Sequence, residues 1–267
     1  MKRLFGTTLL ALTATTVLVA GCSSNSDTDT TTTTTGSASS DQITGDLTVF
    51  AAASLKATFT KLGEQFEADH PGTDVAFNFA GSSDLVAQLT QGAPADVFAS
   101  ADTANMTKAV DAGLVDGSPT NFATNTLTIV TPPGNPKNIT SFADLAAPGN
   151  QVVVCAPQVP CGAATKKIED AAGVDIAPVS EESSVTDVLG KVTTGQADAG
   201  LVYVTDAAGA GDAVVTVDFP ESATVVNTYP IASLKSTQNP SAAKAFVELV
   251  TGPVGQQVLA GAGFAAP

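Results

Sequence analysis

Two serines stand where an apolar, strand-like run gives way to a helical pattern. Ser54 follows the run VFAAA, and Ser82 follows FAG. A serine at such a junction places a hydroxyl beside the unpaired backbone N–H groups of the first helical turn. Small neighbours let another group approach this backbone, so both junctions suit an oxyanion and need no charged side chain. The alternative is that both serines are ordinary helix N-caps, and Asp84 fits it because its side chain can return a hydrogen bond to the cap.

Few other side chains could carry out catalysis or hold a metal ion. The single histidine, His70, precedes Pro71-Gly72 and is expected in a surface turn. A Ser-His-Asp triad would have to use it, and the chain has neither a Gly-x-Ser-x-Gly elbow nor a Ser-x-x-Lys with Lys-Thr-Gly. One histidine and two tyrosines also argue against direct metal coordination. An exported hydrolase is therefore the less favoured alternative.

The composition excludes another class of function. The chain has 267 residues, with 11 Lys and Arg against 26 Asp and Glu, which gives a formal charge of −15. Nucleic-acid binding is not expected, because phosphate contacts need clustered basic residues. The hydrophobic fraction of 43% with 14% charged residues is typical of a globular chain. The length suits two lobes or one large domain.

Short apolar runs alternate with amphipathic stretches along the folded part. Strands are expected at 47–50, 74–79, 96–99, 127–131, 152–155, 200–204, 213–217 and 225–232. Helices are expected at 54–68, 82–90, 104–110, 161–171, 184–193 and 242–250. This alternation predicts an α/β fold with mainly parallel sheets. Ligands of such sheets bind beyond the carboxyl ends of the strands, which is where Ser54 and Ser82 lie.

The N-terminal segment predicts export. Lys2 and Arg3 precede an apolar run, so residues 1–21 read as a signal peptide. The run ends in Val-Ala-Gly-Cys and resembles a bacterial lipoprotein cleavage box, which implies that Cys22 becomes the lipid-carrying first residue. An ordinary signal peptide with an incidental cysteine is the alternative. Residues 22–43 are rich in Ser and Thr and are expected to be a disordered tether. The protein is thus expected outside the cell, lipid-anchored to the outer face of the cell membrane.

The other two cysteines, Cys155 and Cys161, lie in one short loop. Oxidising compartments favour a disulfide between them. Closing this loop would stabilise the fold by about 2 kcal/mol in the chain-entropy model. A metal-binding pair is the weaker alternative, because no further cysteine or nearby histidine completes a coordination set.

Several blocks, taken in order, resemble the molybdate-binding proteins of ABC importers. They are TVFAAASL at 48–55, FAGSSDL at 79–85, GAPADVFASAD at 92–102, VPCG at 159–162, GLVYVTD at 200–206 and TYPI at 228–231. The resemblance implies a two-lobed periplasmic-binding-protein fold of type II with mixed, mostly parallel sheets. It also implies two crossover hinge strands, near 122–127 and 225–231. Lobe one would comprise 44–123 plus 229–267, and lobe two 124–228.

The resemblance also implies a ligand site of five residues. Ser54 and Ser82 would each donate from a hydroxyl and a backbone N–H. Cys161 and Val185 would donate from the backbone N–H alone, and Tyr203 from its phenol. Cys161 departs from the alanine typical of that position, and a backbone donor tolerates the change. No residue would coordinate a metal ion directly, because the molybdenum would be held as its oxyanion.

The resemblance implies that the protein captures molybdate, or tungstate, and delivers it to an ABC permease and its ATPase. Such a protein is expected to be a monomer without cofactor and not an enzyme. A site of donors only suits a fully ionised oxyanion and rejects phosphate, which keeps a proton near neutral pH. Sulfate fits the same donors and stays the close alternative. The acidic charge predicts that long-range attraction does not accelerate anion binding.

Overall fold

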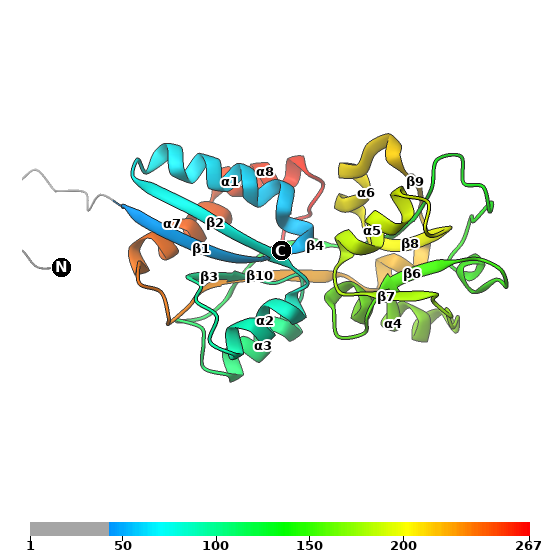
Figure 1. The fold of residues 1–267 in the computed structure, drawn as a ribbon, viewed down its shortest axis with the longest axis horizontal. Coiled ribbons are helices and arrows are strands. Elements are labelled where there is room, and N and C mark those ends of the chain that lie inside the picture. The colour runs from blue at the N-terminus through cyan, green and yellow to red at the C-terminus, as the bar shows by residue number, and fades with distance from the viewer. Residues whose placement is uncertain (1–42) are drawn as a thin grey trace, which may run out of the picture. The chain divides into compact units, whose positions relative to one another are not determined.

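The computed structural model describes residues 43–267. The predicted signal peptide, the predicted lipidation site Cys22 and all of the predicted tether except residue 43 lie outside the described residues. Within the described part, the strands form two five-stranded sheets, each flanked by helices (Figure 1). We call the part built around each sheet the first and the second lobe.

The first sheet has the strand order β2-β1-β3-β10-β4. Its strands are β1 (Gly45–Ala52), β2 (Thr73–Ala80), β3 (Val97–Ala99), β4 (Thr120–Asn125) and β10 (Asn227–Ser233). Strands β2, β1 and β3 are parallel, and β10 pairs antiparallel with both β3 and β4. The β10 strand therefore brings a distant part of the chain into the middle of this sheet.

The second sheet has the order β7-β6-β8-β5-β9. Its strands are β5 (Leu127–Thr131), β6 (Val152–Cys155), β7 (Ser180–Glu182), β8 (Ala199–Tyr203) and β9 (Val215–Val217). Strands β7, β6 and β8 are parallel, whereas β5 pairs antiparallel with β8 and β9. Both sheets are mixed, and the expected parallel pairing holds for the three strands on one side of each.

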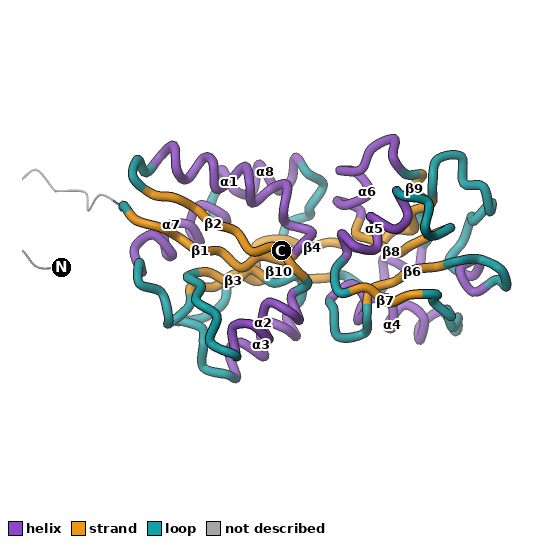
Figure 2. The backbone as a smooth tube through the Cα atoms, in the orientation of Figure 1, coloured by secondary structure: helices purple, strands orange, loops and turns teal. Residues whose placement is uncertain are grey.

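Helices cover both faces of each sheet (Figure 2). In the first lobe they are α1 (Lys56–Asp69), α2 (Ser82–Thr90), α3 (Thr103–Asp111), α7 (Pro240–Thr251) and α8 (Pro253–Gly261). In the second they are α4 (Pro160–Ala172), α5 (Val185–Thr193) and α6 (Val204–Ala210). Short 3-10 turns lie at Ala53–Leu55, Ala143–Ala146, Gly211–Ala213 and Pro220–Thr224.

The alternation of side chains along β1 explains why helices pack on both faces of the first sheet. Val49 and Ala51 belong to the core that includes α1 and α7, whereas Phe50 belongs to a separate core with α2 and α3. Successive strand residues point to opposite faces, so an apolar run such as VFAAA can be buried on both. On α1, the buried Phe59 and Phe66 both contact the ring of Phe246 on α7, with centroids 6.0 and 5.6 Å apart.

Two segments join the lobes. Strand β4 ends at Asn125 and β5 begins at Leu127, and the chain returns at Asn227, where β10 begins. The domain boundaries predicted at 123/124 and 228/229 fall inside β4 and β10, and they stay predictions.

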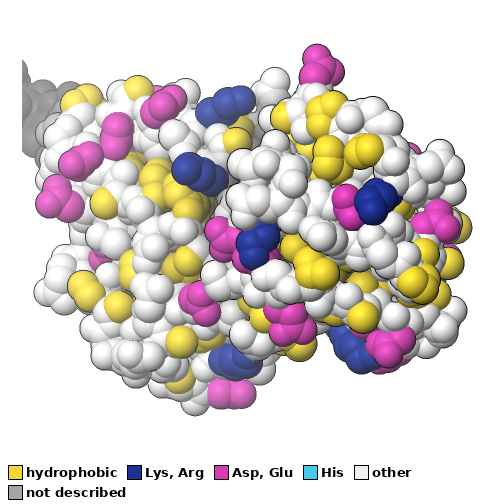
Figure 3. Space-filling model, turned by 45° about the vertical axis from the view of Figure 1, so that its right-hand side comes forward, with side chains coloured by type: hydrophobic (Ala, Val, Ile, Leu, Met, Phe, Trp, Pro, Cys, Tyr) yellow, Lys and Arg dark blue, Asp and Glu magenta, His cyan; other side chains and the backbone are white. Residues whose placement is uncertain are grey.

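Charged side chains of both signs lie on the face of the molecule drawn in Figure 3. On the face drawn in Figure 3, the basic side chains are separated from one another and interspersed with acidic ones. No helix among residues 43–267 is long and apolar enough to cross a membrane.

Candidate functional site

One small cavity is lined by all five residues proposed from the sequence. It is lined by Ala52, Ala53, Ser54, Gly81, Ser82, Ala101, Val159, Pro160, Cys161, Val185 and Tyr203. These residues come from the junctions that follow β1, β2, β3, β6 and β8, and from the start of α5. The cavity therefore lies between the lobes, at strand ends and helix starts, as expected for an α/β fold.

The first lobe contributes two hydroxyls. Ser82 is the first residue of α2, and Gly81 occupies the N-cap position without any side-chain cap among the described residues. Ser54 lies inside the 3-10 turn Ala53–Leu55, which leads into α1. The alternative that both serines are N-caps is therefore wrong, because each already has a helical position. In the part of the chain that the structure describes, neither hydroxyl is used to cap its own helix.

Each of these hydroxyls has a partner on its protein side. The backbone N–H of Ala101 donates to Ser82 Oγ at 3.0 Å. Ser54 Oγ lies 3.2 Å from Tyr229 Oη. Since the Ser82 oxygen already accepts a hydrogen bond, its proton is available to a ligand in the cavity.

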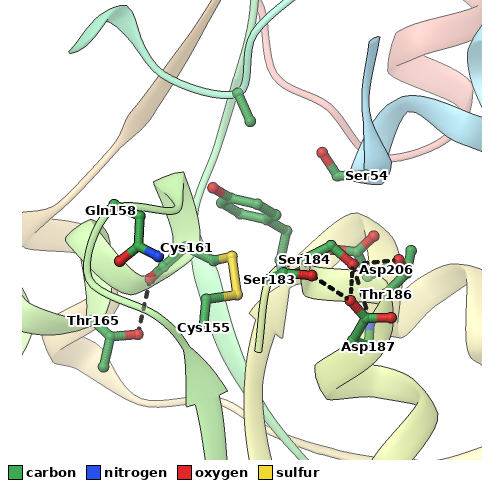
Figure 4. The surroundings of a disulfide bond; sticks show 12 residues. Ser54, Cys155, Gln158, Cys161, Thr165, Ser183, Ser184, Thr186, Asp187 and Asp206 are labelled. Atoms are coloured by element: carbon green, nitrogen blue, oxygen red, sulfur yellow. Dashed lines mark hydrogen bonds between the residues drawn. A yellow bond between two sulfur atoms is a disulfide. The ribbon is translucent and has the colours of Figure 1, made fainter. Parts of the chain in front are cut away.

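The second lobe contributes backbone donors at two helix starts (Figure 4). Helix α4 begins at Pro160 after the N-cap Val159, which has no side-chain cap bond among the described residues, and Cys161 is its second residue. Val185 is the first residue of α5, where the side chain of Ser184 accepts from the N–H of Asp187. The first N–H groups of a helix have no intrahelical acceptor. The N–H groups of Cys161 and Val185 are therefore available to a ligand.

The starts of helices α2, α4 and α5 and the 3-10 turn before α1 all meet this cavity. Each α-helix N-terminus carries about half a positive charge from its aligned peptide dipoles. Within the described part of the chain, no lining residue carries a charged side chain. An anion in this cavity would therefore be attracted by peptide dipoles and N–H groups, which act locally and are compatible with an acidic chain.

Tyr203, at the end of β8, is 1% exposed. Its Oη accepts a hydrogen bond from Asn227 Nδ2 at 3.0 Å. Burial raises the pKa of Tyr203 well above its ordinary value, and the neighbouring Tyr229 adds to the shift. The phenol thus stays protonated and can act only as a neutral donor to an anion.

Asp206, in the first turn of α6, is an acidic group beside Tyr203. Its Oδ2 accepts from the backbone N–H of Tyr203 at 3.2 Å. Burial raises the pKa of Asp206 to about 7, against the lowering effect of that hydrogen bond. Near neutral pH, a large share of this carboxyl is therefore uncharged, which limits its repulsion of an anion.

Hydrolysis would require a general base among the side chains that line the cavity. As far as the structure describes the chain, the cavity lining contains no histidine, aspartate or glutamate that could act as a general base. His70 is the C-cap of α1, at the end of that helix remote from Ser54. Among residues 43–267, no three His, Cys, Asp or Glu side chains cluster as metal ligands would.

Cys155 and Cys161 form a disulfide with Cα atoms 5.6 Å apart. It ties the end of β6 to the first turn of α4 (Figure 4), and Cys161 lines the cavity. The sequence prediction of this pairing agrees with the structure. Sequence reasoning missed Asn227 and the partner role of Tyr229, although Tyr229 lies in a block quoted for the resemblance.

The family model for bacterial extracellular solute-binding proteins matches residues 47–265, which include every residue of the cavity. The chain belongs to this family. This solute-binding protein is 62% identical to the molybdate-binding protein ModA of Mycobacterium tuberculosis, over 83% of this chain and 85% of that one. It is 30% identical to the putative ABC transporter substrate-binding lipoprotein YvgL of Bacillus subtilis, over 96% of each chain. The periplasmic molybdate-binding protein of Azotobacter vinelandii has a similar structure, with a TM-score of 0.71, 25% identity and coverage of 83% of this chain and 99% of that one.

Proposed function

We propose that this solute-binding protein captures molybdate, or the similar tungstate, between its lobes and delivers it to an ABC importer. The observation that carries the proposal is the donor set of the cavity. Its lining includes Ser54, Ser82, Cys161 and Val185, each of which has a backbone N–H, and the phenol of Tyr203, and no described residue of the lining carries a charged side chain. The similarity to two molybdate-binding proteins supports the choice of ligand.

A site of donors selects the protonation state of its ligand. Molybdate, tungstate and sulfate are fully ionised near neutral pH and can accept a hydrogen bond at every oxygen. Hydrogen bonds to a charged group each contribute about 1.5–3 kcal/mol. Phosphate keeps a proton near neutral pH, and that proton would face another donor. Leaving it unpaired costs about 1–3 kcal/mol, so phosphate binds more weakly.

Sulfate is the alternative ligand, because it presents the same charge and the same acceptors. Only the size of the closed cavity distinguishes sulfate from the larger molybdate. The similarity to named molybdate-binding proteins favours molybdate.

The cellular setting belongs to the same proposal. A lipid on Cys22 holds the protein at the outer face of the membrane, and the similarity to a chain named as a lipoprotein supports this. We expect a monomer that has no cofactor, catalyses no reaction, and passes its ligand to a permease and an ATPase.

Isothermal titration calorimetry of the purified protein with molybdate, tungstate, sulfate and phosphate tests the proposal. We expect tight binding of molybdate and tungstate, weaker binding of sulfate and the weakest binding of phosphate. A melting-temperature series gives an independent measure, because ligand at a hundred times its Kd stabilises the fold by about 2.7 kcal/mol. Binding of phosphate without binding of molybdate would overturn the proposal.

A further inference from the structure

The amide of Asn227 connects two hydroxyls of the cavity without lining the cavity itself. Asn227 is the first residue of β10, where the chain crosses back to the first lobe, and it is 7% exposed. Its Nδ2 donates to the carbonyl oxygen of Ala101 at 2.9 Å and to Tyr203 Oη at 3.0 Å. It therefore bonds to one residue of each lobe.

The partners fix which way this amide faces. A backbone carbonyl can only accept, so the nitrogen of Asn227 must face Ala101. The second N–H of the same nitrogen then meets Tyr203 Oη, which has to accept. The phenol proton of Tyr203 is thereby directed away from Asn227.

The same chain of bonds reaches Ser82. The residue that accepts from Asn227, Ala101, donates its own N–H to Ser82 Oγ at 3.0 Å. Tyr203 thus accepts a hydrogen bond directly from Asn227. Ser82 accepts one from Ala101, whose carbonyl oxygen is held by Asn227. In both hydroxyls the oxygen accepts on the protein side, so each proton can be donated to a ligand. For the Tyr203 proton, the competing acceptor is the neighbouring Tyr229, whose ring centroid lies 5.9 Å away.

We propose that Asn227 is a positioning residue that determines ligand specificity, because its amide forces the Tyr203 hydroxyl to donate and so restricts the cavity to oxyanions without a proton. This inference rests on the proposed function. It adds that the discrimination against protonated oxyanions is set at Asn227, outside the residues that touch the ligand.

An aspartate at position 227 keeps the shape of the side chain but reverses its hydrogen bond with Tyr203, so that the phenol donates to residue 227. A neutral carboxyl would put a protonated oxygen where the nitrogen of Asn227 lies, and this oxygen would donate its proton to the Ala101 carbonyl and accept from the Tyr203 hydroxyl. An ionised carboxylate would also accept from Tyr203. In either state the phenol oxygen turns a lone pair toward the cavity, where a protonated oxyanion can donate to it.

The test measures the Kd of molybdate and of inorganic phosphate near neutral pH by calorimetry, for the wild type, Asn227→Asp and Asn227→Ala. We expect Asn227→Asp to weaken molybdate binding by about a hundredfold and to lower the molybdate-over-phosphate preference by at least about tenfold. Asn227→Ala removes the bonds but supplies no acceptor. It should weaken molybdate by about tenfold or less and leave the preference within about threefold of the wild type.

The variant Tyr203→Phe separates this specific role from a general loss of structure. In a Tyr203→Phe background there is no hydroxyl to reverse, so Asn227→Asp should no longer change the preference between the two anions. The melting temperature of the ligand-free variants establishes that each is folded. If Asn227→Asp does not fold, the comparison uses Asn227→Ala, whose loss of molybdate affinity should shrink at least threefold in the Tyr203→Phe background.

The outcomes separate the two proposals. A wild type that does not bind molybdate contradicts the proposed function. A wild type that binds molybdate, combined with an unchanged preference in Asn227→Asp or an equal change with and without the Tyr203 hydroxyl, overturns only the role of Asn227.

Discussion

At the scale of single residues, Ser82 and Ser83 stand side by side but have opposite surroundings. Ser82 lines the cavity and accepts from Ala101, whereas Ser83 Oγ is buried and has no partner among the described residues. Ser82→Ala should weaken molybdate binding by about 1.5–3 kcal/mol, because it removes a donor to a charged ligand. It should also destabilise the fold by about 1 kcal/mol, since the Ala101 N–H loses its acceptor.

Ser83→Ala is the matched control for this prediction. It removes no hydrogen bond, so the molybdate affinity should not change and the melting temperature should stay the same or rise. Calorimetry and thermal unfolding measure both effects. Equal affinity in the two variants would show that the Ser82 hydroxyl does not touch the ligand.

Asp206 should make stability depend on pH. Its folded-state pKa of about 7 lies above the ordinary value of 3.8, so the folded protein holds this proton more tightly than the unfolded chain. Its contribution is therefore fully present below about pH 4 and is lost as the pH rises toward about 7. Across this window, the free energy of unfolding should fall by up to about 1.4 kcal/mol per pH unit.

Asp206→Asn should remove this component, because an amide oxygen still accepts from the Tyr203 N–H but does not titrate. Denaturant unfolding of the ligand-free protein at a series of pH values checks the prediction. A difference in stability between the variant and the wild type that stays constant from pH 4 to 8 would contradict the raised pKa of Asp206.

At the scale of the elements, the starts of α2 and α5 approach so closely that only glycine fits at position 81. A Cβ on Gly81 would lie 2.1 Å from the carbonyl oxygen of Ser183, which belongs to the other lobe. Gly81→Ala should therefore hold the lobes apart and weaken molybdate binding by at least about tenfold, as expected for overpacking that costs about 1–3 kcal/mol.

Gly190→Ala provides the control for the helix itself. Gly190 lies in α5, and a Cβ added there would meet no described atom within 4 Å, so alanine should raise stability by about 0.5–1 kcal/mol and leave the affinity unchanged. Solution scattering adds a second measurement. Molybdate should reduce the radius of gyration of the wild type and of Gly190→Ala but not of Gly81→Ala, and contraction of all three would contradict the steric role of Gly81.

The disulfide should act on both stability and binding. It fixes the loop that leads to the N–H of Cys161, so its removal adds an ordering cost when the ligand binds. The double variant Cys155→Ala/Cys161→Ala keeps every backbone donor. We expect it to lose about 2 kcal/mol of stability in the chain-entropy model and to bind molybdate more weakly. An unchanged affinity with lowered stability would limit the disulfide to a structural role.

The elements differ in how well their sequences predict them. Helix α1 is apparent from its apolar spacing, and β6 from its run of valines. Helix α6, with the sequence VTDAAGA, lacks an apolar period and begins where Asp206 accepts from the Tyr203 N–H, so its sequence alone does not predict it. Strand β4, TNFATN, is largely polar and is held in place by pairing with the distant β10.

The residues of the candidate site also differ in how well the sequence predicts them. A serine at a strand-to-helix junction is visible in the sequence, so Ser54 and Ser82 could be proposed from residue type. The N–H groups of Cys161 and Val185 could not, because any residue except proline has one, and only the resemblance indicates them. Asn227 meets Tyr203 across 24 residues and Ala101 across 126, and no local pattern records such contacts.

At the scale of the whole molecule, an acidic surface is compatible with an anion site because the dipoles of the site act at short range. The formal charge of −15 acts over distance, but ions screen it beyond about 8 Å at physiological salt. The helix starts act within the closed cavity, where no competing charge from the described residues lines the wall. The protein should therefore hold its ligand tightly without attracting it from afar.

The central claim is that uncharged donors from both lobes enclose an oxyanion. A crystal structure of the protein grown with molybdate tests it most directly. We predict one molybdate in the cavity, with its oxygens accepting from the N–H groups at Ser54, Ser82, Cys161 and Val185 and from the Tyr203 hydroxyl. A molybdate bound elsewhere by lysine side chains, with this cavity left without it, would contradict the claim.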